Sequence, residues 1–139
     1  MRKLLCFPLA LFLWAGLSVP ALQAAQPADS ADLVVYGGTA SGVITAYSAA
    51  REGLHVVLLE PGTHLGGMVT GGLSATDLGH FAMIGGYARD FYRKAAAHYG
   101  VKDLERPENW LSEPHVDEAI FHDLLQSSAV TVRFHERLR

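Results

Sequence analysis

Residues 33–60 read LVVYGGTASGVITAYSAAREGLHVVLLE, and this stretch decides the fold. An apolar run at 33–36 leads into a glycine-rich turn at 37–42, and a second apolar run follows at 54–59. Between them, small side chains recur at the spacing of one helix face, and Gly53 suits the end of that helix. Strand, glycine turn, helix and strand in this order predict a βαβ unit, which belongs to an α/β fold with a parallel sheet.

The turn between the first strand and the helix has the composition of a dinucleotide-binding site. A pyrophosphate is held by unpaired backbone N–H groups at a helix N-terminus. Gly37 allows the tight exit from the strand, and Gly42 allows the helix to pack close to the sheet. Thr39 replaces the middle glycine of the usual GxGxxG pattern, and its hydroxyl can donate a hydrogen bond to a phosphate. Glu60, 23 residues after Gly37, stands where a carboxylate accepts hydrogen bonds from an adenosine ribose.

A second glycine-rich segment follows directly. Residues 61–72 read PGTHLGGMVTGG, with two glycine pairs and few side chains that could pack in a core. Backbone of this kind lies close to a flat or charged ligand, although an ordinary flexible loop has the same composition. A glycine pair at this place favours FAD as the dinucleotide, and an NAD-dependent enzyme is the weaker alternative.

Residues 34–79 resemble the N-terminal part of a family of FAD-dependent oxidoreductases of the glutathione-reductase type, whose members carry a GGTxxG turn and an LGGM segment. Some members are exported bacterial proteins described as xanthan lyases. The resemblance continues through 84–92 and 110–121, so it covers most of residues 32–139. It implies a Rossmann-like FAD/NAD(P)-binding domain, incomplete in this chain. The implied activity is that of an oxidoreductase which transfers hydride or electrons through FAD, with an organic small molecule as substrate.

The resemblance also implies which residues contact FAD. The turn would hold the pyrophosphate and Glu60 the adenosine ribose. The following loop would approach FAD mainly through its backbone, since His64 and Met68 stand where commoner flavoproteins carry arginines. The implied cofactor-binding residues are Gly37, Gly38, Thr39, Ala40, Ser41, Gly42, Glu60, Leu65, Gly66, Gly67 and Met68. No residue is assigned a catalytic role.

The remaining chain is predicted to continue the same α/β pattern. Helices are expected at 86–99 and 116–126, each with apolar residues on one face. A polar connection at 101–111 separates them, and an alternating run at 129–134 predicts a third parallel strand.

Seven histidines raise the question of a metal site. His115, Glu118 and His122 lie at helical spacing and could share one face. They do not form the HExxH pattern, and no cysteine accompanies them. We predict no metal ion and interpret such histidines as partly exposed helix residues. The resemblance implies that His115 lies near the flavin or the substrate, without a role that the sequence defines.

Composition limits the class of protein. The chain has 139 residues, of which 50% are hydrophobic and 18% charged, with a formal net charge of −3. It is too apolar to be disordered, and its charge offers no basic surface for nucleic acid. A single cysteine cannot build a disulfide framework. These figures fit a small globular domain or part of a larger one.

The amino terminus has the order of a secretory signal. Residues 1–25 combine a basic start, a short apolar run and small residues near a cleavage point, and the run is too short to span a bilayer. We expect export to the periplasm or the extracellular space, with no stable membrane anchor after cleavage; an uncleaved anchor or a buried helix is the alternative. Residues 26–31 are expected to be a linker and 32–139 a truncated FAD-binding domain. Such a piece is expected to lack turnover by itself, so a non-catalytic nucleotide-binding fragment is the alternative function.

Overall fold

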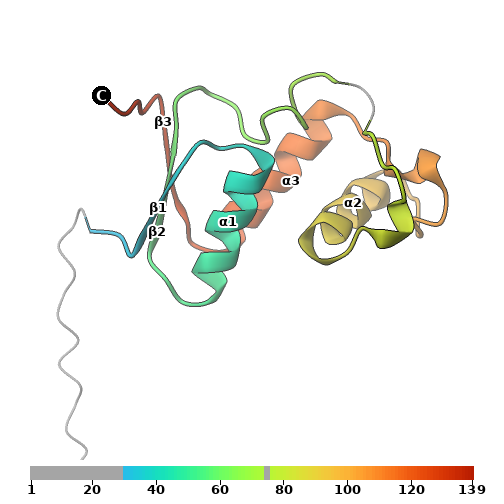
Figure 1. Ribbon diagram of the computed structural model, residues 1–139, viewed down its shortest axis with the longest axis horizontal. Helices are drawn as coiled ribbons and strands as arrows, with labels where there is room; N and C mark the ends of the chain where they lie inside the picture. The colour runs from blue at the N-terminus through green and yellow to red at the C-terminus, as the bar shows by residue number, and fades with distance from the viewer. Residues whose placement is uncertain (1–29, 74–75) are drawn as a thin grey trace, which may run out of the picture.

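The computed structural model of the protein describes residues 30–73 and 76–139. The predicted signal segment 1–25 and most of the predicted linker 26–31 lie outside these residues. Figure 1 shows a sheet at one end of the molecule, two helices packed on it and a third helix farther out. None of the helices in the described ranges is long and apolar enough to cross a membrane.

The sheet is entirely parallel, and β2 lies in its middle. Its strands are, in spatial order, β1 (Leu33–Tyr36), β2 (Val56–Glu60) and β3 (Thr131–Phe134). Leu58 lies opposite Val35 on one side and Val132 on the other. The third parallel strand predicted at 129–134 is confirmed, but it begins two residues later than expected. The reason is that Ala129 has a φ of 56°, which is outside strand geometry.

Two helices, α1 (Ala40–Arg51) and α3 (Pro114–Ser127), cover one face of the sheet, and α2 (Gly86–His98) packs on the outer side of α3 (Figure 1). Parallel neighbours need crossover connections, and crossovers of the same hand from β1 to β2 and from β2 to β3 place both helices on one face. Two short 3₁₀ turns, η1 (Phe81–Met83) and η2 (Pro107–Trp110), flank α2.

The first helix begins where Thr39 caps it. The Thr39 Oγ1 accepts a hydrogen bond from the Gly42 N–H at 3.1 Å, and the Thr39 carbonyl accepts the first helical bond from Val43 at 2.9 Å. The helix ends at Arg51, and Gly53, with a φ of 89°, follows it as predicted. Local signals therefore set both ends of α1.

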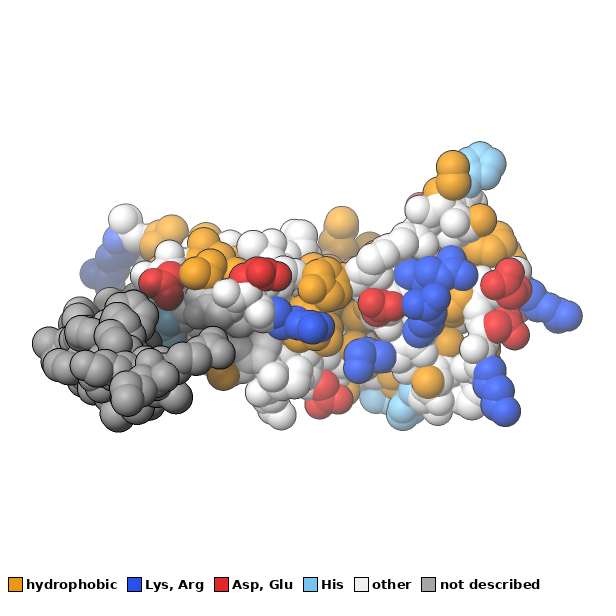
Figure 2. All heavy atoms as spheres, turned by 90° about the horizontal axis from the view of Figure 1, so that it is seen from below, with side chains coloured by type: hydrophobic (Ala, Val, Ile, Leu, Met, Phe, Trp, Pro, Cys, Tyr) orange, Lys and Arg blue, Asp and Glu red, His pale blue; other side chains and the backbone are white. Residues whose placement is uncertain are grey.

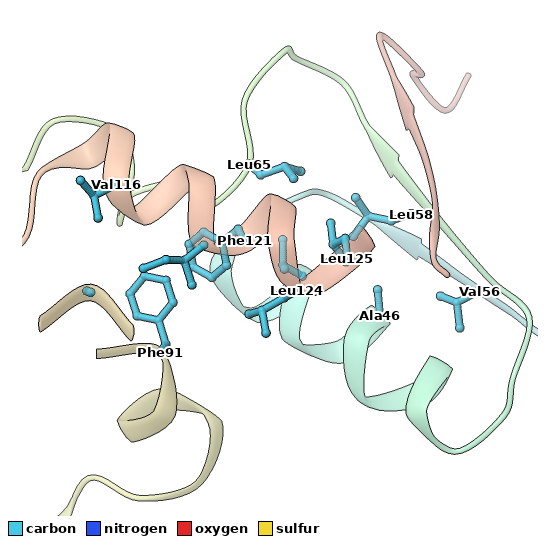
Figure 3. Packing of buried hydrophobic residues seen from close by; sticks show 12 residues of the cluster. Ala46, Val56, Leu58, Leu65, Phe91, Val116, Phe121, Leu124 and Leu125 are labelled. Carbon is cyan, nitrogen blue, oxygen red and sulfur yellow. The ribbon is translucent and has the colours of Figure 1, made fainter. Parts of the chain in front are cut away.

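The main core lies between the sheet and the two covering helices (Figure 3). Val56 and Leu58 of β2 are fully buried and face Ala46 of α1 and Leu125 of α3. The alternation of buried and less buried residues along β2 turns one face of this strand toward both helices. Burial of this face holds the βαβ unit and α3 together.

The third helix is longer than the predicted helix 116–126 and turns a different residue inward. Pro114 occupies its first helical position, where the missing N–H needs no acceptor. Phe121 lies in the core, whereas Ala119, expected on the apolar side, is exposed. The Phe121 ring stacks on Phe91 with centroids 4.6 Å apart, and this contact joins α2 to α3.

An acidic residue is buried near the start of α3. Asp117 is 4% exposed, and its Oδ1 accepts a hydrogen bond from the Ser112 hydroxyl at 2.6 Å. Burial raises the pKa of the Asp117 carboxyl, and the Ser112 bond opposes that shift. The bond ties the chain that enters α3 to the first turn of the helix.

The segment 101–111, expected to be a polar connection, carries part of a second core. Leu104 and Trp110 are 3% and 1% exposed and pack with Ala96 of α2. The Trp110 indole N–H donates to the Leu104 carbonyl at 3.0 Å, which satisfies the polar edge of a buried ring. The expectation is wrong for these residues because single apolar positions in a polar segment have no periodicity that indicates burial.

The surface carries charges of both signs. On the face shown in Figure 2, acidic and basic side chains are interspersed, with hydrophobic side chains between them. The acidic side chains of the described residues therefore do not form a single patch on this face.

Replacement of Gly42 by alanine tests the close approach of α1 to the end of β1. A Cβ at Gly42 would overlap the carbonyl oxygen of Gly37, which belongs to the backbone and cannot rotate away. We expect Gly42→Ala to lower the free energy of unfolding by about 1–3 kcal/mol, measured by urea unfolding. Gly85→Ala is the control, because no atom beyond its chain neighbours lies within 4 Å of its Cβ position, so that only its place as N-cap of α2 is affected, at a cost of no more than about 1 kcal/mol. Equal losses in the two variants would contradict the prediction.

Replacement of Thr39 tests the cap of α1. Thr39→Ala removes the oxygen that accepts the Gly42 N–H, so we expect the free energy of unfolding to fall by about 1 kcal/mol. Thr39→Ser keeps the hydroxyl and is expected to retain most of the wild-type stability. Identical urea midpoints for the alanine and serine variants would show that the side-chain bond does not stabilise the helix.

Candidate functional site

The turn after β1 leaves backbone N–H groups without helical partners. The chain leaves the strand at Gly37, whose φ of 101° favours glycine and whose N–H donates to the Leu59 carbonyl at 2.8 Å. Ala40 and Ser41 occupy the first positions of α1, so their N–H groups have no acceptor within the helix. Together with the positive end of the helix dipole, these N–H groups make the start of α1 suitable for an anion.

Glu60, the last residue of β2, holds two backbone segments. Its Oε2 accepts a hydrogen bond from the Gly38 N–H at 2.6 Å, and its Oε1 accepts one from the Gly62 N–H at 2.6 Å. An ionised carboxylate has about four acceptor sites, so each oxygen keeps a lone pair for another donor. Because the residue is only half-buried, a ligand at this end of the sheet can reach it.

The glycine-rich loop after β2 lies against the turn. The Gly66 N–H donates to the Gly38 carbonyl at 2.6 Å, and Thr39 and Gly66 pair as neighbours in a parallel ladder do. A Cβ at Gly67 would lie 3.4 Å from the Cα of Thr39. The two glycine-rich segments therefore form one continuous surface at the carboxyl ends of β1 and β2.

Most of the predicted cofactor-binding residues belong to this surface. They are Gly37, Thr39, Ala40, Ser41, Glu60 and Gly67, with the buried Gly38, Gly42 and Gly66 directly beneath it. The Leu65 side chain is fully buried in the main core, so this residue can offer a ligand only its backbone. The Met68 side chain is 77% exposed. The contact of each of these residues with FAD stays a prediction.

Glu118 of α3 also belongs to this surface, although the sequence pattern did not reveal it. Its Oε1 accepts a hydrogen bond from the Leu65 N–H at 3.1 Å and lies 3.1 Å from the His64 Nδ1. The partners stand 53 and 54 positions apart along the chain, so no local motif joins them. Within residues 30–73 and 76–139, no three His, Cys, Asp or Glu side chains gather in a way that could hold a metal ion.

An apolar cavity adjoins the start of α1. It has a volume of about 320 Å³, and Ser41 and Val69 line it together with Phe121. The aromatic rings of Tyr87 and Phe91 form part of the wall contributed by α2. Because no charged side chain lines the cavity, it suits an apolar ring better than an anion.

Comparison with known proteins extends these observations. The family model described as FAD dependent oxidoreductase matches residues 32–139. A vinyl phenol reductase of Lactiplantibacillus plantarum is 36% identical over 108 residues, and the match covers 76% of this chain and 20% of that protein. The chain thus spans about a fifth of the length of this curated relative. The crystal structure of Thermovibrio ammonificans THI4 aligns with a TM-score of 0.48 and 19% identity, over 75% of this chain and 38% of that chain.

The family match includes every strand and helix found in residues 30–73 and 76–139. It runs from the start of β1 to beyond β3 and contains the turn, Glu60 and the glycine-rich loop. The resemblance inferred from the residues is therefore confirmed. The chain belongs to the FAD dependent oxidoreductase family, and FAD is its cofactor.

Proposed function

We propose that residues 32–139 hold the adenosine diphosphate half of FAD at the carboxyl ends of β1 and β2, within an oxidoreductase that acts on an organic small molecule. One observation carries this proposal: the N–H groups at the start of α1, the Glu60 carboxylate and the Gly66 backbone meet at one place. Membership of the family supports the oxidoreductase class, and the curated relative is named as a reductase.

The charges of the site suit different parts of FAD. The start of α1 attracts the pyrophosphate through the N–H groups of Ala40 and Ser41. Glu60 would repel a phosphate, but each of its oxygens can accept a further hydrogen bond from a ribose hydroxyl. Its bonds from Gly38 and Gly62 offset part of its negative charge. The ribose therefore belongs at Glu60 and the pyrophosphate at the helix.

Thr39 contributes a donor where the usual pattern has a glycine. Its oxygen accepts the Gly42 N–H and lies 3.1 Å from the Ser41 Oγ, so its hydroxyl hydrogen is available to Ser41 or to a phosphate. When bound, FAD supplies the hydride or electron transfer. The residues of this chain bind and orient its adenosine diphosphate half.

Calorimetric titration of the full chain with FAD, ADP and inorganic pyrophosphate tests the proposal. We expect FAD and ADP to bind to the wild-type chain. Glu60→Ala removes the ribose acceptor, so its ADP affinity is expected to fall about 10- to 100-fold. Pyrophosphate has no ribose and is repelled by the Glu60 carboxylate, so we expect this variant to bind pyrophosphate at least as tightly as the wild type does. Glu52→Ala is the matched control, because Glu52 is an exposed acid at the far end of α1.

Two results would contradict the proposal. A wild-type chain that binds neither FAD nor ADP would remove its basis. Equal ADP affinities for the Glu60→Ala and Glu52→Ala variants would show that Glu60 does not contact the nucleotide.

We further propose that the protein is exported and that residues 1–25 are its signal, as their order of basic, apolar and small residues indicates. N-terminal sequencing of protein recovered from the periplasm or the medium is expected to begin within about two residues of Gln26. A recovered protein that begins at Met1 would contradict this assignment.

A further inference from the structure

We propose that Glu118 is a positioning residue for the cofactor: from α3 it fixes the loop His64–Met68 so that Gly66 and Gly67 stay against the turn that holds the pyrophosphate. The proposal rests on the proposed function, because it concerns the same FAD site. It adds to the FAD site a residue, Glu118, that lies in neither glycine-rich segment. Glu118 itself acts through the loop.

The contacts of Glu118 reach the loop directly before its glycine pair. Its Oε1 accepts the Leu65 N–H at 3.1 Å and lies 3.1 Å from the His64 Nδ1, and its Oε2 lies 3.3 Å from the same nitrogen. The Glu118 side chain is 24% exposed, whereas that of His64 is 78% exposed. Because the bond to Leu65 is charge-assisted and partly buried, it holds the loop more firmly than the exposed contact with His64.

The neighbouring turn of α3 contacts the next residue of the loop. A Cβ at Gly66 would overlap the Thr70 methyl group and lie 2.8 Å from the Phe121 ring, so Thr70 and this ring together fill the space behind the glycine. The Leu65 carbonyl accepts a hydrogen bond from the Thr70 hydroxyl. Leu65 is therefore held through its N–H, its carbonyl and its buried side chain.

The position of Leu65 decides where the glycine pair lies. Gly66 follows immediately and donates its N–H to the Gly38 carbonyl at 2.6 Å. Gly67 comes so close to Thr39 that a Cβ would lie 3.4 Å from its Cα. If Glu118 releases Leu65, the loop can move away from the turn, and backbone that should be in place before FAD arrives must be ordered on binding.

Four variants of the full chain test the proposal by calorimetric titration with FAD. Glu118→Ala removes the acceptor, and we expect FAD affinity to fall about tenfold, because the loop must then be ordered when FAD binds. Glu118→Asp keeps the charge but withdraws the acceptor by one methylene, and a similar loss is expected. Glu118→Gln keeps an oxygen at the same reach and should remain within about threefold of the wild type. Asp123→Ala, which removes an exposed acid from the same helix, is the matched control.

Amide hydrogen exchange of the chain without ligand gives a second readout. Loss of the acceptor should speed exchange at Leu65 and Gly66 in the Glu118→Ala and Glu118→Asp variants, and leave amides of the β2 ladder unchanged. Glu118→Gln should restore the wild-type rates. If the alanine variant does not fold, the aspartate and glutamine variants decide the question.

The outcomes separate this inference from the proposed function. A wild-type chain that binds neither FAD nor ADP overturns both. If the wild type binds FAD and the Glu118→Ala or Glu118→Asp variant binds it as tightly as Asp123→Ala does, the positioning role is overturned while the FAD site stands. The positioning role is also overturned if Glu118→Gln binds FAD as weakly as Glu118→Asp does, since the acceptor for Leu65 is then present without effect.

Discussion

The close contact between the first turn of α1 and the end of β1 is the constraint on which the rest of the structure depends. Because Gly42 has no side chain, the first turn of α1 packs directly against the Gly37 carbonyl. Val43 and Ala46 are thereby fully buried against the sheet. The same contact places the unpaired N–H groups of α1 at the carboxyl end of β1. Core packing and the anion site therefore share one geometric requirement, and a side chain at position 42 would disturb both.

Two carboxylates organise the glycine-rich loop from different sides. Glu60 accepts the N–H groups of Gly38 and Gly62, and Glu118 accepts that of Leu65. A loop with few side chains cannot hold itself by packing, and its backbone N–H groups need acceptors. Hydrogen bonds to a carboxylate are stronger than those to a neutral acceptor. Two acids therefore fix the position of a loop that few side chains could hold. Glu60 thus has a structural role in addition to its proposed contact with the ribose.

The βαβ unit was predictable because its signals are local. The apolar run at 33–36 became β1 with the same bounds, and Gly53 follows α1 where a helix-ending glycine was expected. The burial of Trp110 was not predictable, because it depends on α2 lying beside a segment that has no apolar periodicity. The predicted start of β3 was wrong because no local sequence signal indicated the positive φ of Ala129.

The sequence by itself determined the order of strand, turn, helix and strand, the acid at the end of β2 and the membership of a flavoprotein family, since these depend on residues within a few positions of one another. Only the tertiary structure decided that Gly66 lies against Gly38, that the Leu65 side chain turns into the core and that Glu118 reaches the loop. The last of these contacts joins residues 53 positions apart. It exists because the crossover from β2 to β3 lays α3 beside the loop, and no local preference of the chain encodes that arrangement.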